Sequence, residues 1–540
     1  MTERPALRRP ARAGRPISWT ARAAKVARVA LGAMVATLLA GCTVIPVPAS
    51  TGTSGAAASN TTSSTTSAGS SQPSQASGAV PSSTTALPST ADPASTAEPL
   101  AAASAVAALT EFLDFPDLTP LLVPSPDPEV LSPLLDEALT VQDGSVSAAV
   151  RDGLTGELLY DQGADTAVVP ASAVKVLTAV AALDVLGPDH RYTTAAVGMP
   201  AGPEGTAVVL EAGGDVMLGT GANADEANGR AGLGTLALKT AEALQAQGTT
   251  GTVSVQLDDS GYEGPATSPD WSGDIVSSGN ASVVQPMATY GGRAVPSRDT
   301  DRLHDPALYA AEVFRDQLAA HAQTLELDIT LAAETSRVPA DSAAAEPTSP
   351  EPESTGTELA SVQSASLAEQ MTYMLQSSDN QVAEATGRNL ALAAGAPGSF
   401  SGAAQTIEET LAGLEVDTTG LALVDASGLS GENLVSASQL TAAMQVATTA
   451  PDLEAAVTGL PVAGEQGTLE ERMVGTEAAG NVQAKTGTLS SVASLTGTVK
   501  TEDGRTLLFS FVANGQPGVL DNARFAVDRG AVVLAGCGCR

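Results

Sequence analysis

The chain has 540 residues, more than one average domain, and 43% of them are hydrophobic, which is enough for a sizeable core. Aromatic residues make up only 3%, so aliphatic side chains must fill that core. The formal charge of −34 makes the surface repel phosphate backbones and argues against nucleic-acid binding. Three cysteines and three histidines are too few for a zinc ribbon or a disulfide framework. Because the three histidines are widely scattered, we do not expect histidine to serve as a catalytic base.

The first 41 residues have the pattern of an export signal. Eight basic residues and one acid precede or enter the apolar run 29–41, which is too short for a comfortable transmembrane helix. The run ends in Leu39-Ala-Gly-Cys42, which resembles the lipobox of bacterial lipoproteins. An ordinary signal peptide with a chance cysteine is the alternative. We expect residues 1–41 to direct export and Cys42 to carry a lipid that anchors the protein to the outer side of the membrane.

A low-complexity segment follows the cysteine. From Thr43 to about Ala107 the chain consists of Ser, Thr, Ala, Pro and Gly with few exceptions, and only Asp92 and Glu98 are charged. Such a composition cannot bury enough apolar surface to offset the entropy of ordering. Residues 42–107 are therefore predicted to be a flexible tether, and folded sequence is expected from about residue 108.

The folded part begins with strand and helix signals. Short β-like runs at 145–150 and 157–160 flank Asp-Gly-Leu-Thr-Gly, which predicts a hairpin. Apolar residues recur at helical spacing over 171–186, between Pro170 and Gly187-Pro188. The next 140 or so residues mix short strands, glycine turns and helices such as 234–247.

The second half of the chain ends in a β-rich region. An acidic Pro/Ser segment at 337–357 marks a boundary, and 367–394 is predicted to be helical with an interruption at 377–380. Three strands and a closing helix follow at 481–485, 491–500, 506–513 and 520–534.

This order of elements predicts an α/β (α+β) fold whose antiparallel sheet, flanked by helices, is built from both ends of the chain. The middle of the chain would then be a large inserted region of mixed α/β structure. We expect one domain formed from residues 108–195 and 358–540, with residues 196–357 inserted between the two parts.

Three short motifs carry candidate chemistry, and the first is Ser172-Ala-Val-Lys175. Its serine and lysine lie three residues apart on one face of a helix start, a nucleophile beside an amine. A buried lysine can lose its proton and act as the base that histidine supplies elsewhere. The motif alone is weak, because a capped helix start with a surface lysine would look the same.

The second motif, Ser378-Asp-Asn380, lies in the interrupted helix. At a turn, the hydroxyl and the carboxamide can both face a cleft, where the serine could relay a proton and the asparagine could bind a substrate amide. The same pattern recurs in Ser278-Gly-Asn280, which we discount because it lies in a Gly/Ser loop without flanking helices.

The third motif, Lys485-Thr-Gly487, ends an apolar strand. A cation, a hydroxyl and a small residue on an edge strand suit an extended peptide that ends in a carboxylate, and the amide of Thr488 could donate into an oxyanion hole. With five lysines in the chain, about 0.05 such triplets are expected by chance. An exposed strand end is the alternative interpretation.

The three motifs in this order resemble those of class A β-lactamases and penicillin-binding proteins. The 206 residues between Ser172 and Ser378 are far too many for a compact β-lactamase. The sequence resembles the low-molecular-mass class C penicillin-binding proteins, the D-Ala-D-Ala carboxypeptidase/endopeptidase family, which carries inserted domains between its first two motifs. Further segments between about residues 140 and 540 support the likeness, among them Gly213-Gly-Asp215, Asp258-Asp-Ser260, Asp425-Ala-Ser-Gly-Leu-Ser430 and Leu460-Pro-Val-Ala-Gly464.

The resemblance implies a penicillin-binding/β-lactamase-like catalytic domain and a role for each motif residue. Ser172 would be the acylated nucleophile, Lys175 its general base and Ser378 the proton relay to the leaving group. The substrate would be bound by Asn380, Lys485, Thr486, Gly487 and Thr488, with the amides of Ser172 and Thr488 forming the oxyanion hole. No cofactor and no metal are implied.

The implied reaction is that of a serine-type D-Ala-D-Ala carboxypeptidase acting on peptidoglycan stem peptides, with cleavage of cross-links as a second activity and β-lactams as covalent inhibitors. A β-lactamase or esterase on the same scaffold is one alternative, and a non-catalytic wall-binding lipoprotein is another. At the C-terminus, Cys537-Gly-Cys539 is expected to form a local disulfide or to stay as free thiols, and two ligands do not make a metal site.

Overall fold

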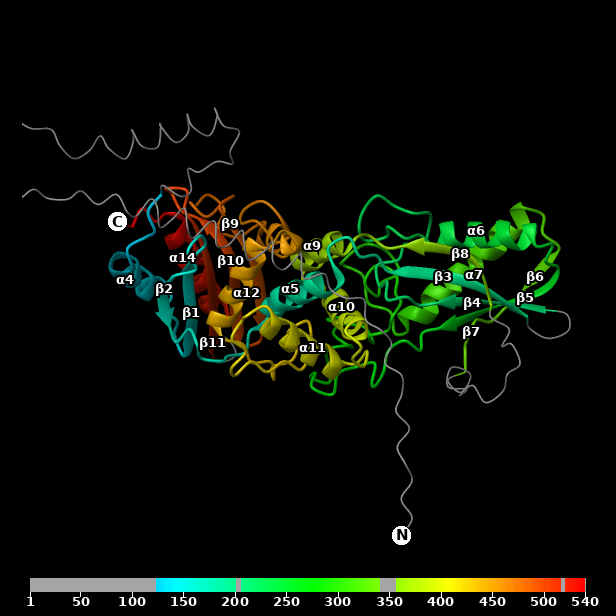
Figure 1. Ribbon diagram of the computed structural model, residues 1–540, viewed down its shortest axis with the longest axis horizontal. Helices are drawn as coiled ribbons and strands as arrows, with labels where there is room; N and C mark the ends of the chain where they lie inside the picture. Colours follow the sequence, from blue (N-terminus) through cyan, green and yellow to red (C-terminus); the bar gives the residue numbers. More distant parts are fainter. Residues whose placement is uncertain (1–122, 201–204, 340–355, 516–519, 540) are drawn as a thin grey trace, which may run out of the picture. The chain divides into compact units, whose positions relative to one another are not determined.

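The computed structural model describes residues 123–200, 205–339, 356–515 and 520–539 (Figure 1). The predicted export signal at 1–41, the lipidation site Cys42, the tether that ends at 107 and the first part of the folded segment lie outside the described residues.

The first sheet is antiparallel and has five strands in the order β2-β1-β11-β10-β9 (Figure 1). Two strands come from the first half of the chain and three from its end, as the sequence predicts. The strands are β1 (Gly144–Asp152), β2 (Leu158–Gln162), β9 (Val482–Leu489), β10 (Val492–Lys500) and β11 (Thr506–Gly515). Strand β9 lies at the edge of this sheet, and on its outer side the backbones of Pro461 and Ala463 pair with Ala484 and Val482. Only the part of this edge from Lys485 onward is therefore available to a ligand.

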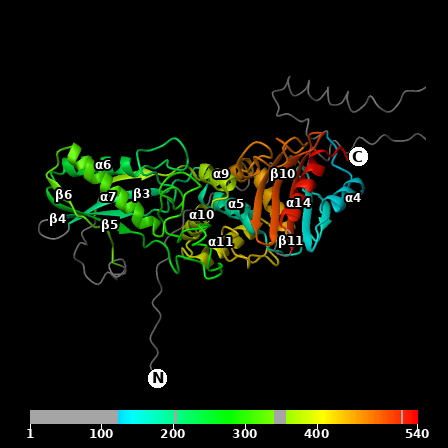
Figure 2. The same ribbon diagram turned by 180° about the vertical axis from the view of Figure 1, so that it is seen from behind.

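The period-two alternation of β11 divides the molecule's largest cores between the two faces of the sheet. Leu508 and Val512 point to the face covered by α12 (Ala437–Thr449), in a core that also contains α5 (Val174–Leu186). Phe509 and Phe511 point to the opposite face, where α14 (Leu520–Ala535) and α4 (Pro128–Ala138) pack. Figure 2 shows α14 beside β10 and β11 from that side.

A buried ion pair joins the turn after β1 to the turn before β11. Asp152 at the end of β1 is bonded by Arg505, which precedes β11, through two nitrogens at 2.7 Å each. Burial alone would raise the pKa of Asp152, but the hydrogen bonds from Arg505 and the backbone of Thr155 lower it to about 2. The pair therefore ties the predicted hairpin to the β10–β11 turn across 353 positions of sequence.

A second, mixed sheet is formed by the middle of the chain, in the order β6-β5-β4-β3-β8 with β7 paired to β5. Strands β4, β5 and β6 are parallel, and β3 runs antiparallel to both of its neighbours. Its strands are β3 (Thr193–Pro200), β4 (Gly205–Glu211), β5 (Gly251–Asp258), β6 (Ile329–Leu331), β7 (Ser336–Arg337) and β8 (Thr357–Gln363).

Two helices cover one face of the second sheet, namely α6 (Leu233–Ala246) and α7 (Pro306–Thr324). Helix α6 was predicted within one residue at each end. Helix α7 was not singled out, although Asp305 as N-cap followed by Pro306 is a helix-start signal. Its many alanines gave a weak apolar period, so the buried Phe314 and Leu318 did not stand out.

The chain enters and leaves the second sheet at neighbouring points. The backbone of Ser364 donates to the carbonyl of Tyr192, and that of Leu367 donates to the carbonyl of His190. The side chain of Arg191 also donates to the Ser364 carbonyl at 2.7 Å. These bonds hold the chain segment that enters the second sheet next to the segment that leaves it.

A helical layer follows the second sheet, made of α9 (Leu367–Ser377), α10 (Asn380–Ala393), α11 (Phe400–Gly413) and the short α13 (Ala455–Thr458). The predicted interruption of the helical region is the break between α9 and α10. There Ser378 adopts the left-handed conformation, with a φ of 56°, and Asp379 caps α10. A capping box at Ser366 and Glu369 starts α9.

No helix among the described residues is long and apolar enough to cross a membrane. At the C-terminus, Cys537 and Cys539 are joined by a disulfide, one of the two states expected from the sequence. The carbonyl of Cys539 accepts from the backbone of Asp127, the N-cap of α4, which fastens the chain end to this helix.

Replacement of Phe511 by alanine tests the core between the first sheet and α14. Phe511 is completely buried, and its removal leaves a cavity that should lower the free energy of unfolding by about 3–5 kcal/mol. Phe525 on α14 is 58% exposed, so Phe525→Ala is the matched control and should change the value by no more than about 0.5 kcal/mol. Urea unfolding of both variants measures the difference, and equal effects would contradict the assignment of this core.

Candidate active site

The predicted nucleophile lies at a tight turn before helix α5. Ser172 is in a single 3₁₀ turn, η1 (Ala171–Ala173), which α5 continues directly. Ala171 has a φ of 50°, an unusual backbone conformation for a residue with a Cβ. This turn leaves Ser172 partly exposed while Lys175, one helical turn later, is completely buried.

Two glycines allow other segments to pack directly against this turn. A Cβ atom on Gly487 would lie 3.0 Å from the backbone nitrogen of Ser172 and 2.1 Å from Ser494 Oγ. A Cβ on Gly428, whose φ is +80°, would lie 2.0 Å from the carbonyl oxygen of Ala171. The glycine of the third motif is therefore required by the close approach of strand β9 to the nucleophile.

Three oxygen atoms surround the amine of Lys175. Its Nζ lies 3.1 Å from Ser172 Oγ, 2.7 Å from Asn380 Oδ1 and 2.6 Å from the carbonyl oxygen of Ser427. The last two oxygens can only accept hydrogen bonds. A neutral lysine would donate its two hydrogens to them, and its lone pair would then point at the hydroxyl of Ser172.

The orientation of Asn380 is fixed from its other end. Its Nδ2 donates to the backbone carbonyl of Asn280 at 2.9 Å, so its Oδ1 must face Lys175. The segment discounted in the sequence, Ser278-Gly-Asn280, thus lies beside the site. This segment contributes the backbone oxygen of Asn280 to the site and is not a second copy of the serine motif. A backbone oxygen leaves no signal in the residue types.

The second serine is bonded to the second buried lysine. Lys485 Nζ donates to Ser378 Oγ at 3.0 Å and to the carbonyl of Thr486 at 2.7 Å. Thr486 Oγ1 donates to Thr468 Oγ1 at 2.8 Å. All three sequence motifs therefore meet in one place, and Thr468, from a segment that the sequence marks only as part of the family resemblance, is an additional polar residue there.

Burial shifts the pKa of both lysines downward. Desolvation lowers the pKa of Lys175 from 10.5 to about 8, against the opposing effect of the Asp425, Glu384 and Asp379 carboxylates. For Lys485, desolvation and the positive charges of Lys175, Arg298 and Arg472 lower the pKa well below its usual value. About a tenth of Lys175 is then neutral at pH 7, compared with less than a thousandth of a free lysine.

A cavity of about 800 Å³ opens above these groups. It is lined by residues of all three motifs, by the 425–431 loop and by the inserted segment, including Ser172, Ser378, Asn380, Thr486, Thr488, Gly428, Leu429, Ser272, Asp274 and Asn280. Lys175 and Lys485 lie below its floor, because both are completely buried. An extended ligand in this cavity would run along the open edge of β9.

The loop 425–430 packs against the turn that carries Ser172 and against Lys175. Asp425 is completely buried, and its carboxylate accepts from the backbones of Gly428 and Ser430 and from Trp271 Nε1, at 2.7–3.0 Å. This folded loop presents the Ser427 carbonyl to Lys175. The sequence marked the segment only as part of a resemblance, because a backbone carbonyl leaves no residue-type signal.

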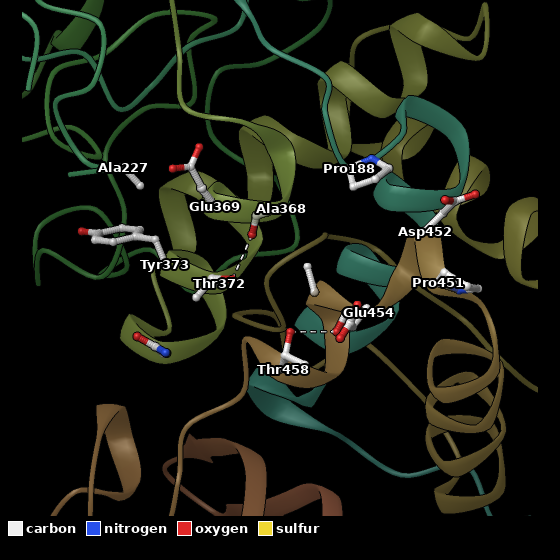
Figure 3. A pocket seen from close by; sticks show the side chains of 12 residues that line it. Pro188, Ala227, Ala368, Glu369, Thr372, Tyr373, Pro451, Asp452, Glu454 and Thr458 are labelled. Atoms are coloured by element: carbon white, nitrogen blue, oxygen red, sulfur yellow. Dashed lines mark hydrogen bonds between the residues drawn. The ribbon is translucent and has the colours of Figure 1, made fainter. Parts of the chain in front are cut away.

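A second hollow, of about 680 Å³, lies along α9 from Ala368 to Gln376 (Figure 3). It is lined by Ala368, Glu369, Thr372 and Tyr373 on one side and by Pro451, Glu454 and Thr458 on the other. The hydroxyls of Thr372 and Thr458 bond to carbonyls of their own helices, as the dashed lines in Figure 3 mark. None of the motif residues reaches this hollow, so it has no converging catalytic groups.

No cluster of three or more His, Cys, Asp or Glu side chains that could hold a metal ion occurs among residues 123–200, 205–339, 356–515 and 520–539. The polar side chains that line the cavity above Ser172 are hydroxyls, the carboxamides of Asn280 and Asn380, and one carboxylate, that of Asp274.

Comparisons with known proteins agree with this arrangement. The sequence matches the D-Ala-D-Ala carboxypeptidase 3 (S13) family over residues 131–302 and 291–534. It is 34% identical to the carboxypeptidase DacB of Mycolicibacterium smegmatis over 429 residues, 78% of this chain and 86% of that protein. It is also 34% identical to a carboxypeptidase of Mycobacterium tuberculosis over 407 residues, 73% of this chain and 81% of the relative.

The fold is similar to that of the crystal structure of penicillin-binding protein 4 (DacB) from Haemophilus influenzae. The TM-score is 0.56 at 20% identity, over 73% of this chain and 96% of the other. The predicted α/β penicillin-binding fold with an antiparallel sheet is therefore confirmed, and the family matches cover more than half of the sequence. The chain belongs to the D-Ala-D-Ala carboxypeptidase 3 (S13) family.

Proposed function

We propose that this protein is a serine-type D-Ala-D-Ala carboxypeptidase in which Ser172 forms the acyl-enzyme and Lys175 acts as its base. The observation that carries the assignment is the contact of 3.1 Å between Ser172 Oγ and a completely buried amine. The two other partners of this amine are acceptors, so deprotonation leaves its lone pair only the serine hydroxyl to bind. Family membership and the homologous carboxypeptidases support the same reaction.

Acylation would proceed as follows. Lys175 removes the proton of Ser172 while Oγ attacks the carbonyl carbon of the D-Ala-D-Ala bond. The backbone amides of Ser172 and Thr488 stabilise the oxyanion of the tetrahedral intermediate. The proton then reaches the leaving amine through Ser378, whose hydroxyl lies 3.0 Å from Lys485 Nζ. Free D-Ala leaves, and water hydrolyses the remaining ester.

Lys485 and Thr486 would bind the C-terminal carboxylate of the stem peptide, and Asn380 its amide. Although the chain as a whole carries a charge of −34, Lys175, Lys485 and Arg298 lie close enough to influence one another at this site. A buried cation with a lowered pKa gains most from an incoming anion. Gly487 keeps the edge of β9 accessible, so an extended peptide can lie along it.

A cross-linked stem peptide contains the same type of bond, so we include cleavage of cross-links as a second activity. β-Lactams would acylate Ser172 in place of the peptide. The meeting of all three motifs around one cavity argues against the non-catalytic wall-binding alternative. A β-lactamase would differ only in how fast the acyl-enzyme is hydrolysed.

We propose the domain organisation from the way the two sheets take their strands from the chain. Residues 108–195 and 358–540 would form the catalytic domain, with residues 196–357 inserted. The first sheet takes strands from both outer segments, and the strands of the second sheet run from Thr193 to Gln363.

We further propose that the protein acts outside the cytoplasmic membrane as a lipoprotein, with residues 1–41 removed on export and Cys42 carrying the lipid. Residues 42–107 would be the tether between lipid and enzyme. Its support is the basic head, the short apolar run and the Leu-Ala-Gly-Cys ending.

Replacement of Ser172 by alanine tests the nucleophile. The wild-type protein should form a long-lived covalent adduct with a fluorescent penicillin, and Ser172→Ala should lose it completely while keeping its thermal midpoint. Ser254→Ala, in strand β5 of the second sheet and outside the lining of the cavity, is the matched control and should label normally. A wild-type protein that destroys penicillin without retaining the label would be a β-lactamase, and labelling of Ser172→Ala would exclude the proposed nucleophile.

The pH dependence of acylation tests Lys175. Since the base works in its neutral form and burial lowers its pKa to about 8, the acylation rate should rise about tenfold per pH unit up to pH 7 and level off above pH 8. Lys175→Arg should lose at least about 1,000-fold, because arginine keeps its proton. Lys239→Arg, on the exposed face of α6, is the control. A rate that does not change between pH 6 and 9 would refute the assignment.

Replacement of Cys42 by serine tests the anchor. A serine cannot accept the thioether-linked lipid, so the variant should move from the membrane fraction to the soluble exported fraction and lose incorporation of labelled fatty acid. Penicillin labelling of Ser172 should persist, since Cys42 precedes the folded part. Cys42→Ser protein that stays lipid-labelled in the membrane would contradict the proposal.

A further inference from the structure

The catalytic turn Ser378–Asn380 has an unusual centre. Its middle residue, Asp379, is 5% exposed and carries a carboxylate with both oxygens occupied. Oδ1 accepts from the backbones of Gln381 and Val382, at 2.9 and 3.2 Å, and so caps helix α10. Oδ2 is bonded by two arginines and does not reach the cavity.

Both arginines come from the inserted region. Arg293 Nη1 lies 3.2 Å and Arg302 Nη2 3.3 Å from Asp379 Oδ2, and the side chains of all three residues are at most 10% exposed. The backbone of Gly291 packs on the same carboxylate, because a Cβ there would lie 3.1 Å from Oδ2. The carboxylate is thus enclosed by the segment 291–302.

The arginines are held in place themselves. Arg302 donates through Nε to the carbonyl of Gly279 at 3.1 Å and through Nη1 to the carbonyl of Gly291. Arg293 donates through Nε to the carbonyl of Thr300 at 3.3 Å. Fixed donors of this kind lose little side-chain entropy when they bind an acceptor, so they can fix the position of Asp379.

The turn needs such support. Ser378 has a φ of 56°, a conformation that costs a non-glycine residue of order 1–3 kcal/mol unless its surroundings hold it. Arg298 Nη2, from the same inserted segment, donates to the carbonyl of Ser377 at 2.6 Å, directly before the strained residue. Two residues after Ser378, Asn380 Nδ2 donates to the carbonyl of Asn280 at 2.9 Å.

We propose that Arg293 and Arg302 act through Asp379 as positioning residues for Ser378 and Asn380, so that the inserted region is a working part of the active site. This inference rests on the proposed function, since the turn matters for acylation only if its serine and asparagine take part. Ser378 Oγ and Asn380 Oδ1 each bond to a catalytic-site lysine, and both are one residue from Asp379. A small shift of the turn would lengthen both contacts together.

The positive charges of Arg293 and Arg302 favour the ionised form of the Asp379 carboxyl group. Burial alone would raise the pKa of Asp379, but the charges of Arg302 and Arg293 together with the capping bonds lower it below its usual value. Without the arginines, an ionised carboxylate would be buried without a matching charge, a costly arrangement. Removing one partner should therefore displace the turn rather than leave it unchanged.

A double-mutant cycle in the full-length protein tests the proposal, with Arg302→Gln, Asp379→Asn and both together. Asparagine keeps an oxygen that can cap α10, so Asp379→Asn removes chiefly the charge. Each single variant should lower the limiting rate of penicillin acylation about 10- to 100-fold, with the apparent dissociation constant of penicillin within about twofold of wild type. The double variant should lose no more than the worse single variant, because both act through one contact.

Two further variants separate positioning from general stability. Arg302→Lys keeps the charge and should recover part of the rate lost in Arg302→Gln. Arg337→Gln breaks another ion pair of the inserted region, with Asp305 and Asp259, and should acylate at the wild-type rate. Thermal midpoints are measured for every variant, and if Arg302→Gln does not fold, the cycle is run with Arg302→Lys.

The proposal is overturned if the single variants acylate within twofold of wild type, if their losses multiply in the double variant, or if Arg337→Gln loses rate to the same extent. Failure of the proposed function would look different. In that case the wild-type protein itself would not acquire a label at Ser172, whereas a failure of this inference leaves the wild type labelled and the Asp379 variant equally fast.

Discussion

The active site depends on one buried amine. Lys175 has no contact with solvent, and its three oxygen partners come from segments that are far apart in sequence: the turn before α5, the start of α10 and the 425–430 loop. Desolvation makes the neutral amine accessible near physiological pH, and the two acceptors give that amine a direction. The helical layer, the strained turn at Ser378 and the glycine contacts all bring these three oxygens to one nitrogen.

The region that we propose to be inserted, residues 196–357, contacts the proposed catalytic domain at more places than the two points where the chain passes between them. Its loops supply the carbonyl of Asn280 to Asn380, the indole of Trp271 to Asp425, and the arginines that surround Asp379. These contacts come from the segment that joins β5 to α7, whereas the sheet of the inserted region packs against its own helices α6 and α7. The inserted region thus has a self-contained core and a separate group of loops directed at the site.

Much of the fold was predictable from the sequence, because the elements that form the first sheet have clear local patterns. The hairpin, the three C-terminal strands, α5, α6 and the break between α9 and α10 all carry turn residues or apolar periods. Helix α7 could not be predicted in the same way, because its many alanines weaken the contrast between apolar and polar positions along the helix. The motifs indicated the residues that we propose to carry the chemistry, and the structure brings those residues together. The supporting groups could not be found in this way, since the carbonyls of Ser427 and Asn280 belong to the backbone and Arg293 and Arg302 lie in an irregular segment.

The pairing of β1 with β11 has a consequence for how the chain acquires its structure. Strand β1, which begins at Gly144, pairs with β11, which ends at Gly515, so the first sheet cannot close until residues up to 515 are present. Contacts between such distant segments fold slowly, because a long loop must be ordered before they form. Strand β9, with Lys485, also arrives after every other part of the site. A chain that lacks β9 and the strands after it therefore has Ser172 and Lys175 but no assembled site around them.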